Sequence, residues 1–149
     1  MKKNKGFTLI ELLVVLAIIG MLASIVFTRV QTARTRARDA ERVQEIKSLQ
    51  NALALYSASN GGNFPPLGGP FPYGPASLTG SDAVSTALKS SGSINAIPMD
   101  PTNSGSYVYT YEAPSATNYT IRYFLETDSI LGKNGAEGTT SGNPQTARP

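Results

Sequence analysis

The sequence predicts an α+β protein in which a long N-terminal α-helix, membrane-spanning in its first half, packs on a small antiparallel β-sheet. Three observations predict this class. Residues 7–27 form an apolar run that contains one charge. From Val30 to Tyr56, apolar residues recur every three or four positions, as on one face of a helix. Further on, two runs rich in β-branched and aromatic residues are separated by five residues, as in a hairpin.

The apolar run from Phe7 to Phe27 is the most informative segment of the chain. As a helix it would span roughly 32 Å at 1.5 Å per residue, which is enough to cross the hydrocarbon core of a bilayer. Its one charge, Glu11, is expensive to place in lipid. An ionisable residue in such a span indicates function and requires a partner.

Two simpler interpretations of this run compete. A secretory signal peptide has an apolar stretch of about 7–15 residues, followed by a cleavage site of small residues. Here the run is longer, Glu11 interrupts it, and Leu22-Ala-Ser-Ile is a poor match to such a site. The other alternative is a plain single-pass anchor in which Glu11 lies near the membrane interface.

The first eleven residues together resemble the signature of type IV prepilins. That family comprises type IV pilins and the pseudopilins of type II secretion and DNA uptake. The matching features are the short basic leader with its Lys5-Gly6 junction, the start at Phe7 and the acidic residue four positions later, namely Lys2, Lys3, Lys5, Gly6, Phe7 and Glu11. Several matches within eleven residues make the motif specific.

The resemblance implies a pilin-like fold and a processing pathway. Residues 1–6 would be a leader peptide, cut off after Gly6 by prepilin peptidase, and the new N-terminus at Phe7 would be N-methylated. Residues 7–28 would form the transmembrane and filament-core helix. Glu11 would pair with the Phe7 amine and set the register of each incoming subunit during assembly.

Basic residues flank the span on both sides, so charge counting does not place the N-terminus in the cytoplasm. Those before the span belong to the leader, and those after it are Arg29, Arg34, Arg36 and Arg38. The resemblance implies a cytoplasmic leader, because prepilin peptidase works on that face of the membrane.

The helix should continue to about residue 59 as part of a head domain over residues 29–131. Neither Gly nor Pro interrupts the chain between Met21 and Asn60, so span and head helix should form one helix of about 50 residues. The Asn60-Gly61-Gly62 segment should end it. Its charged residues predict a solvated face or, as an alternative, contact with lipid headgroups and neighbouring subunits. They are Arg34, Arg36, Arg38, Asp39, Glu41, Arg42 and Glu45.

Residues 60–105 should form a loop and a short helix. The stretch from Phe64 to Pro75 is too rich in Pro and Gly for a helix or a central strand. It predicts a surface loop whose aromatic side chains lie on the head. Ser81 is the expected N-cap of a helix over Asp82–Ser90.

Residues 106–126 predict an antiparallel hairpin with a turn at 113–117. Two strands alone are marginally stable, so the hairpin should pack on the long helix. A third short strand added to the hairpin is the alternative. Tyr107, Tyr109 and Tyr111 share one face of the first strand and are interpreted as packing residues rather than a ligand platform.

Composition excludes several kinds of site. The 149 residues include 13 basic and 10 acidic ones. Without the three leader lysines the two balance, so the basic pI does not indicate nucleic-acid binding, which stays open. The absence of His and Cys rules out imidazole and thiolate metal sites, a Ser-His-Asp triad, a Cys nucleophile and disulfides. No two carboxylates are placed persuasively for acid–base catalysis, so an enzyme is not expected.

No cofactor is expected, with calcium as the one alternative. The Ile97-Pro-Met-Asp100-Pro segment is similar to one in major pseudopilins, some of which bind calcium in C-terminal loops. Asp100, Asn103 and Asp128 offer oxygen ligands, but their spacing matches no recognised calcium loop. A turn at Asp100 explains them without a metal. The polar, glycine-rich tail at 132–149 should be flexible.

The sequence thus predicts a non-enzymatic structural subunit of a type IV pilus or pilus-like filament. Its expected partners are copies of itself, the prepilin peptidase and methylase, an inner-membrane assembly platform and the lipid bilayer. It should be a single-pass protein of the cytoplasmic membrane before assembly, and part of a cell-surface or periplasmic filament afterwards. The alternatives are a pseudopilin of a type II secretion or DNA-uptake system, and a membrane-anchored binding module that never polymerises.

Overall fold

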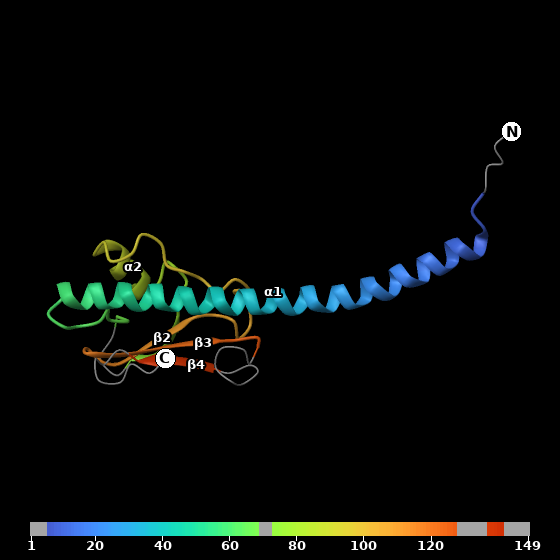
Figure 1. The fold of residues 1–149 in the computed structure, drawn as a ribbon. Helices are drawn as coiled ribbons and strands as arrows, with labels where there is room; N and C mark the ends of the chain where they lie inside the picture. The colour runs from blue at the N-terminus through green and yellow to red at the C-terminus, as the bar shows by residue number, and fades with distance from the viewer. Residues whose placement is uncertain (1–5, 69–72, 128–136, 142–149) are drawn as a thin grey trace. The chain divides into compact units, whose positions relative to one another are not determined.

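The computed structural model describes residues 6–68, 73–127 and 137–141. Its elements in chain order are α1 (Leu9–Ser59), β1 (Tyr73–Ser77), α2 (Ala83–Ser90), β2 (Thr110–Ser115), β3 (Asn118–Phe124) and β4 (Glu137–Ser141) (Figure 1). The chain divides into two units, residues 1–35 and residues 36–149, and α1 contributes to both. A long helix with a small antiparallel sheet is the pilin-like α+β fold that the sequence predicts.

α1 is one unbroken helix of 51 residues, which confirms the predicted continuity of span and head helix. It ends where predicted. Gly61 takes a left-handed conformation (φ 64°), and the Gly62 N–H donates to the Ser57 carbonyl at 2.9 Å. Glycine is suited to this position because it has no Cβ to clash in that conformation.

The sheet has the strand order β1-β2-β3-β4, and all its pairs are antiparallel. The predicted hairpin is confirmed as β2 and β3, but its boundaries differ. β2 begins at Thr110 and continues through Pro114 to Ser115, so the turn shrinks to two residues. Pairing is irregular between Glu112 and Ser115, and such an irregularity accommodates a proline that cannot donate to the ladder.

The two outer strands come from segments predicted to be irregular. β1 includes Pro75 and lies at the edge of the sheet, which agrees with the prediction that this stretch forms no central strand. The predicted flexible tail is wrong for Glu137–Ser141, which pairs with β3 over five positions. Backbone pairing needs no apolar side chains, so the polar composition of this strand gave no signal. The rest of the 132–149 tail lies outside the described residues.

α2 begins one residue later than predicted, and its N-cap is Asp82 rather than Ser81. The Asp82 carboxylate accepts hydrogen bonds from the Ser85 N–H at 2.9 Å and from the Thr79 N–H at 2.7 Å. Aspartate caps a helix as well as serine does, and here it also closes the turn before the helix.

In the second unit, α1 lies between α2 and the sheet (Figure 1), and all three contribute to one hydrophobic core. The fully or almost fully buried apolar residues are Ile46, Leu49, Ala52, Leu53, Leu78, Val84, Leu88, Tyr109, Tyr111, Ala113, Tyr119, Ile121, Tyr123 and Leu125. Burial of Tyr109 and Tyr111 confirms the packing interpretation of the tyrosines. The Phe64 ring meets the Tyr119 ring edge-on with centroids 4.6 Å apart, as expected of an aromatic loop residue laid on the head.

Candidate assembly site

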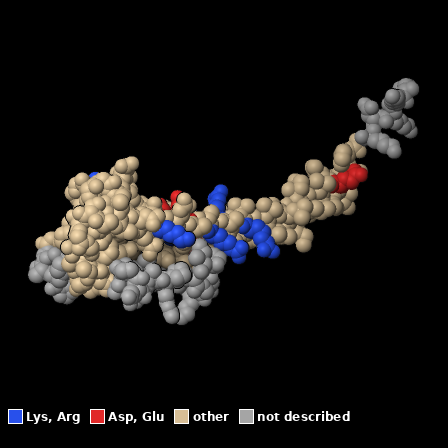
Figure 2. Space-filling model, turned by 60° about the vertical axis from the view of Figure 1, so that its left-hand side comes forward, with Lys and Arg blue, Asp and Glu red and all other residues tan. Residues whose placement is uncertain are grey.

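The apolar stretch of α1 is exposed all round. Every large apolar side chain from Phe7 to Phe27 is at least 46% exposed, and an 18-residue window of the helix has a mean hydropathy of 2.8 with none of it buried. In Figure 2 this stretch shows no lysine or arginine and one acidic group near its start, whereas basic side chains gather further along α1. Apolar surface of this extent marks a membrane or protein contact.

Glu11 has its hydrogen-bond partner in Thr8, the residue before α1. The Thr8 N–H donates to Glu11 Oε2 at 2.8 Å, and the Thr8 hydroxyl donates to the same oxygen at 2.7 Å. In return, the Glu11 N–H donates to Thr8 Oγ1 at 3.3 Å. This is a capping box, in which two residues three positions apart satisfy the free donors of a helix start. Sequence reasoning missed Thr8, although the Thr-x-x-Glu spacing signals this cap.

Gly6 and Phe7 precede the helix and are both exposed, with the Phe7 side chain 85% accessible. A Cβ added at Gly6 would meet no atom of the described residues within 4 Å, and Gly6 has no left-handed backbone. The fold itself therefore does not require glycine at the predicted cleavage site.

A shallow apolar groove of about 480 Å³ lies on the exposed part of α1. It is bounded by side chains from three successive turns, namely Ile19, Leu22, Ala23, Val26, Phe27 and Val30, with Gln31 and Arg34 at its end. Grooves between such side-chain rows accept the ridges of a second helix.

A second cluster of functional side chains lies within the head, around the buried guanidinium of Arg42. Its Nε donates to Asp100 Oδ2 at 2.7 Å, and its Nη2 donates to Asp100 Oδ1 at 3.1 Å. Its Nη1 donates to Asp39 Oδ1 at 2.8 Å and to Glu126 Oε1 at 2.7 Å. Arg38 also pairs with Glu126 through both of its oxygens. We call Arg38, Asp39, Arg42, Asp100 and Glu126 the arginine cluster.

Two further contacts complete the surroundings of Arg42. The Thr102 hydroxyl oxygen accepts a hydrogen bond from Nη2 at 2.9 Å, and the Tyr107 ring centroid lies 4.7 Å from the guanidinium carbon. A buried charge is tolerated when each donor finds an acceptor, and the ring face adds a cation–π contact.

Asp39 uses its oxygens to fasten the chain segment that leaves β3. Its Oδ1 accepts from the Glu126 N–H at 2.9 Å, and its Oδ2 accepts from the Thr127 N–H at 2.8 Å and from the Thr127 hydroxyl at 2.6 Å. The arginine cluster therefore joins three segments that are far apart in sequence, namely α1, the loop at 100–103 and the end of β3.

The predicted solvated face is wrong for Asp39 and Arg42, whose side chains are fully buried. Ala37 and Ala40, which continue the apolar periodicity, are exposed instead. The helix thus turns a polar face to the head at this point, and hydrogen bonding rather than apolarity allows it. Arg34, beyond the cluster, is exposed as predicted.

The arginine cluster stabilises the ionised forms of Arg42 and Glu126. Burial alone would lower the pKa of Arg42, but hydrogen bonds to Asp100, Glu126 and Asp39 outweigh it and raise that pKa above its ordinary value. The hydrogen bonds from Arg38 are the main cause that lowers the pKa of Glu126 to about 2, against burial and with further help from Arg42. Both groups are therefore ionised at neutral pH.

Asp100 is a candidate calcium ligand, but both of its carboxylate oxygens accept hydrogen bonds from protein donors. Besides Arg42, the N–H groups of Thr102 and Asn103 donate to its Oδ1 at 2.7 and 3.3 Å. These bonds confirm its predicted turn role. In the described part of the chain, no three acidic side chains are arranged to hold a metal. Asp128 lies outside the described residues, so calcium binding stays a prediction.

The N-terminal segment matches a known family. The family described as the prokaryotic N-terminal methylation motif matches residues 1–27, which confirms the resemblance of the first eleven residues to the prepilin signature. No solved structure matches this fold.

Relatives among characterised proteins fall into two groups. The type II secretion system core protein G of Vibrio cholerae is 29% identical over 93% of this chain and 89% of its own length. That of Escherichia coli is 41% identical over 58 residues, 39% of this chain and 40% of the relative. A fimbrial protein of Pseudomonas aeruginosa is 46% identical over 52 residues, 35% of this chain and 34% of the relative. Two of these three alignments thus cover about two fifths or less of the relatives' length.

Proposed function

Since this chain carries the N-terminal methylation motif of pilins and pseudopilins on a pilin-like fold, we propose that it is a structural subunit of a type IV pilus or pilus-like filament. One observation carries the proposal. The apolar part of α1 is exposed all round and begins directly after the Gly6–Phe7 junction. The role is structural rather than enzymatic.

The same apolar surface serves before and after assembly. In the cytoplasmic membrane, lipid tails cover it. In a filament, apolar side chains of neighbouring copies replace the lipid, and the groove that contains Leu22 and Val26 offers a place for them. Association driven by packing in this way needs no cofactor and no covalent bond.

Processing by prepilin peptidase explains the residues at the junction. Because nothing in the fold requires Gly6, its lack of a side chain fits a narrow subsite of an enzyme that cuts after it. Cleavage turns the peptide nitrogen of Phe7 into an amine, which the same enzyme N-methylates. An assembly platform in the inner membrane then receives the cut subunit.

Glu11 is suited to receive that amine. Both Thr8 donors go to its Oε2, and among the described residues none donates to its Oε1. The Thr8 hydrogen bonds reduce the cost of keeping a carboxylate in an apolar layer, and the open oxygen can accept the Phe7 ammonium of a neighbouring copy. Such pairing fixes the axial register of the incoming helix.

A second candidate is a pseudopilin of a type II secretion or DNA-uptake system. The observation in its favour is the length of chain over which each relative aligns. The alignment with the Vibrio cholerae secretion protein extends over both units, whereas the fimbrial alignment covers 52 residues. Deletion of the gene in its host separates the two. Loss of surface pili indicates a pilin, and a block in the release of secreted proteins or in DNA uptake, with pili intact, indicates a pseudopilin.

The proposal is tested by electron microscopy of sheared surface filaments, labelled with antibody against the head. We expect labelled filaments from the wild-type strain and none from the deletion strain. A chain that is processed and abundant, yet found only in the membrane and never in a filament, would overturn the proposal. It would favour an anchored binding module.

A further inference from the structure

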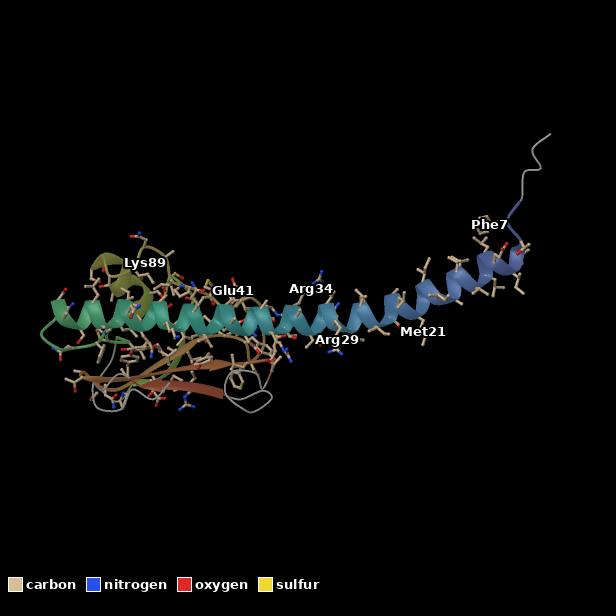
Figure 3. All side chains as sticks on the ribbon, viewed as in Figure 1. Phe7, Met21, Arg29, Arg34, Glu41 and Lys89 are labelled. Carbon is tan, nitrogen blue, oxygen red and sulfur yellow. The ribbon has the colours of Figure 1, made fainter. Side chains whose placement is uncertain are left out.

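Glu41 lies on the side of α1 that also carries α2 (Figure 3), and it lines a second groove in the head. The groove measures about 560 Å³ and lies between α1 and the loop before Asp100. The α1 side is polar, with Glu41, Gln44, Glu45 and Ser48, and residues 94–98 form the other side. The mixed polar and apolar lining suits a long side chain with an apolar stem and a charged end.

The described residues that line the groove include two acidic side chains and no basic one. Tyr109 donates a hydrogen bond to Glu45. Glu41 is exposed, and within the described residues it makes no ion pair or hydrogen bond. Burial is the main cause that raises the pKa of Glu45, the Tyr109 hydrogen bond opposes it, and the charge of Glu41 raises it further. A positively charged group in the groove would relieve this repulsion.

The same unit also has an exposed basic side chain that pairs with no acidic side chain of the described residues. Arg36 is exposed and forms no ion pair with the described part of the chain. At about 100° per residue, Arg36 and Glu41 lie about 140° apart around α1. The two therefore cannot meet within one helix, but parallel copies that stand side by side can present them to each other.

The order of the two charges along α1 is the same as in the pair proposed at the N-terminus. Arg36 precedes Glu41 by five residues, about 7.5 Å, and Phe7 precedes Glu11 by four, about 6 Å. In both pairs the cation comes first, so each pair by itself is satisfied when the next parallel copy is displaced in the same direction along its helix.

We propose that copies of this chain contact one another head to tail, with Arg36 of one copy seated in the groove beside Glu41 of the next. This interface rests on the proposed filament function and names the surfaces of the heads that meet. Because the two surfaces differ, the contact is heterologous, and because each copy is displaced along the helix from the last, it continues without closing, as an open filament requires.

Charge reversal in the full chain tests the pairing. Arg36→Glu and Glu41→Arg each place like charges at every contact, so we expect at least a roughly tenfold loss of filaments from either. The double variant Arg36→Glu/Glu41→Arg should restore them. Lys47→Glu is the matched control. It makes the same charge change on an exposed side chain roughly 16 Å further along α1 than Arg36, so filaments should form as in the wild type.

Cross-linking tests proximity directly, since the chain has no cysteine of its own. With a short bis-maleimide, Arg36→Cys/Glu41→Cys should give a ladder of covalent multimers. Each single variant should give few or no cross-links, because the interface brings residue 36 beside residue 41 and not beside a second copy of itself. Lys47→Cys/Glu41→Cys should give no ladder.

A double charge reversal no better than either single one, or the absence of a ladder from Arg36→Cys/Glu41→Cys, would overturn the interface. So would normal filaments from Arg36→Glu alone. If Glu41→Arg abolishes filaments while Arg36→Glu does not, the groove takes a different partner. These outcomes concern the interface alone when the wild type builds filaments; a wild type that builds none refutes the filament function itself.

Discussion

Arg42 joins three segments of the head through charge-assisted hydrogen bonds. It reaches Asp39 on its own helix, Asp100 in the loop before the sheet and Glu126 after β3. A chain without cysteine cannot fasten these segments with a disulfide. The arginine cluster takes that role in a head whose small size limits the apolar surface it can bury.

Arg42→Ala should therefore destabilise the head strongly. The change leaves Asp39 and Asp100 buried without their cation, and breaking a buried pair in this way costs about 3–5 kcal/mol. Urea unfolding of the soluble head measures the loss. Arg42→Lys, which keeps the charge but not the planar fork, should lose less, and Arg34→Ala, which changes an exposed side chain, should stay within about 0.5 kcal/mol of wild type. Equal stability of Arg42→Ala and wild type would show that the cluster contributes nothing.

Glu126 makes the stability of the head depend on acid pH. Hydrogen bonds from Arg38 and Arg42 lower its pKa from 4.5 to about 2. The unfolded chain thus binds a proton that the folded head does not. The stabilisation, on the order of 3 kcal/mol, is complete above about pH 4.5 and is lost as the pH falls towards 2. The raised pKa of Glu45 acts in the opposite sense.

Melting temperatures of the head, recorded from about pH 6 to pH 2.5, should fall most steeply below pH 4.5. The variant Glu126→Gln should start lower and fall less steeply. A variant that melts with the same pH profile as wild type would assign the acid sensitivity to another group.

Glu11→Val should block assembly without blocking insertion, because the span becomes more apolar. Cleavage after Gly6 should largely survive. We expect processed protein at normal level in the membrane and few or no filaments, measured by immunoblot and electron microscopy. Thr8→Ser, which retains both donors of the capping box, should assemble as wild type does. Filaments of normal length and number from Glu11→Val would leave the charge in the span unexplained.

At the scale of elements, the sequence predicted what depends on periodicity and missed what depends on distant partners. The continuous helix, its end before Gly61 and the hairpin follow from local patterns. β1 and β4 do not, because each forms by adding backbone to an existing edge of the sheet.

The sites show the same division. The N-terminal motif is local, so the sequence alone singles out Gly6, Phe7 and Glu11, whose roles in processing and assembly stay predictions. The arginine cluster brings together residues up to 88 positions apart. No spacing pattern in one sequence would reveal that such distant residues meet. The local indication of this cluster in the sequence is the i,i+3 pair of Asp39 and Arg42. Pairs with this spacing also occur on solvated helix faces.

A head freed of residues 1–28 should be a soluble, folded domain. Its core from α1, α2 and the sheet lies in residues 36–149 and includes none of the apolar span. Circular dichroism should show helix and strand with one cooperative melt. An aggregated or unfolded product would mean that the sheet needs neighbouring subunits. Adding a chelator tests calcium in the same sample; since Asp100 is occupied by protein donors, we expect an unchanged melt.

At the scale of the whole molecule, one chain has to serve in two surroundings. The apolar part of α1 suits lipid and neighbouring helices, and the head suits water. We propose that the step that commits the chain to assembly is the cut after Gly6, which would create the amine that Glu11 receives. The proposed function therefore depends on the chemistry of the N-terminus.

Mass spectrometry of the chain recovered from sheared filaments tests this claim most directly. The proposed function predicts a single N-terminus at Phe7 that carries one methyl group, with the leader absent. A chain that starts at Met1, or one cut near Ser24 as a secretory signal would be, contradicts it.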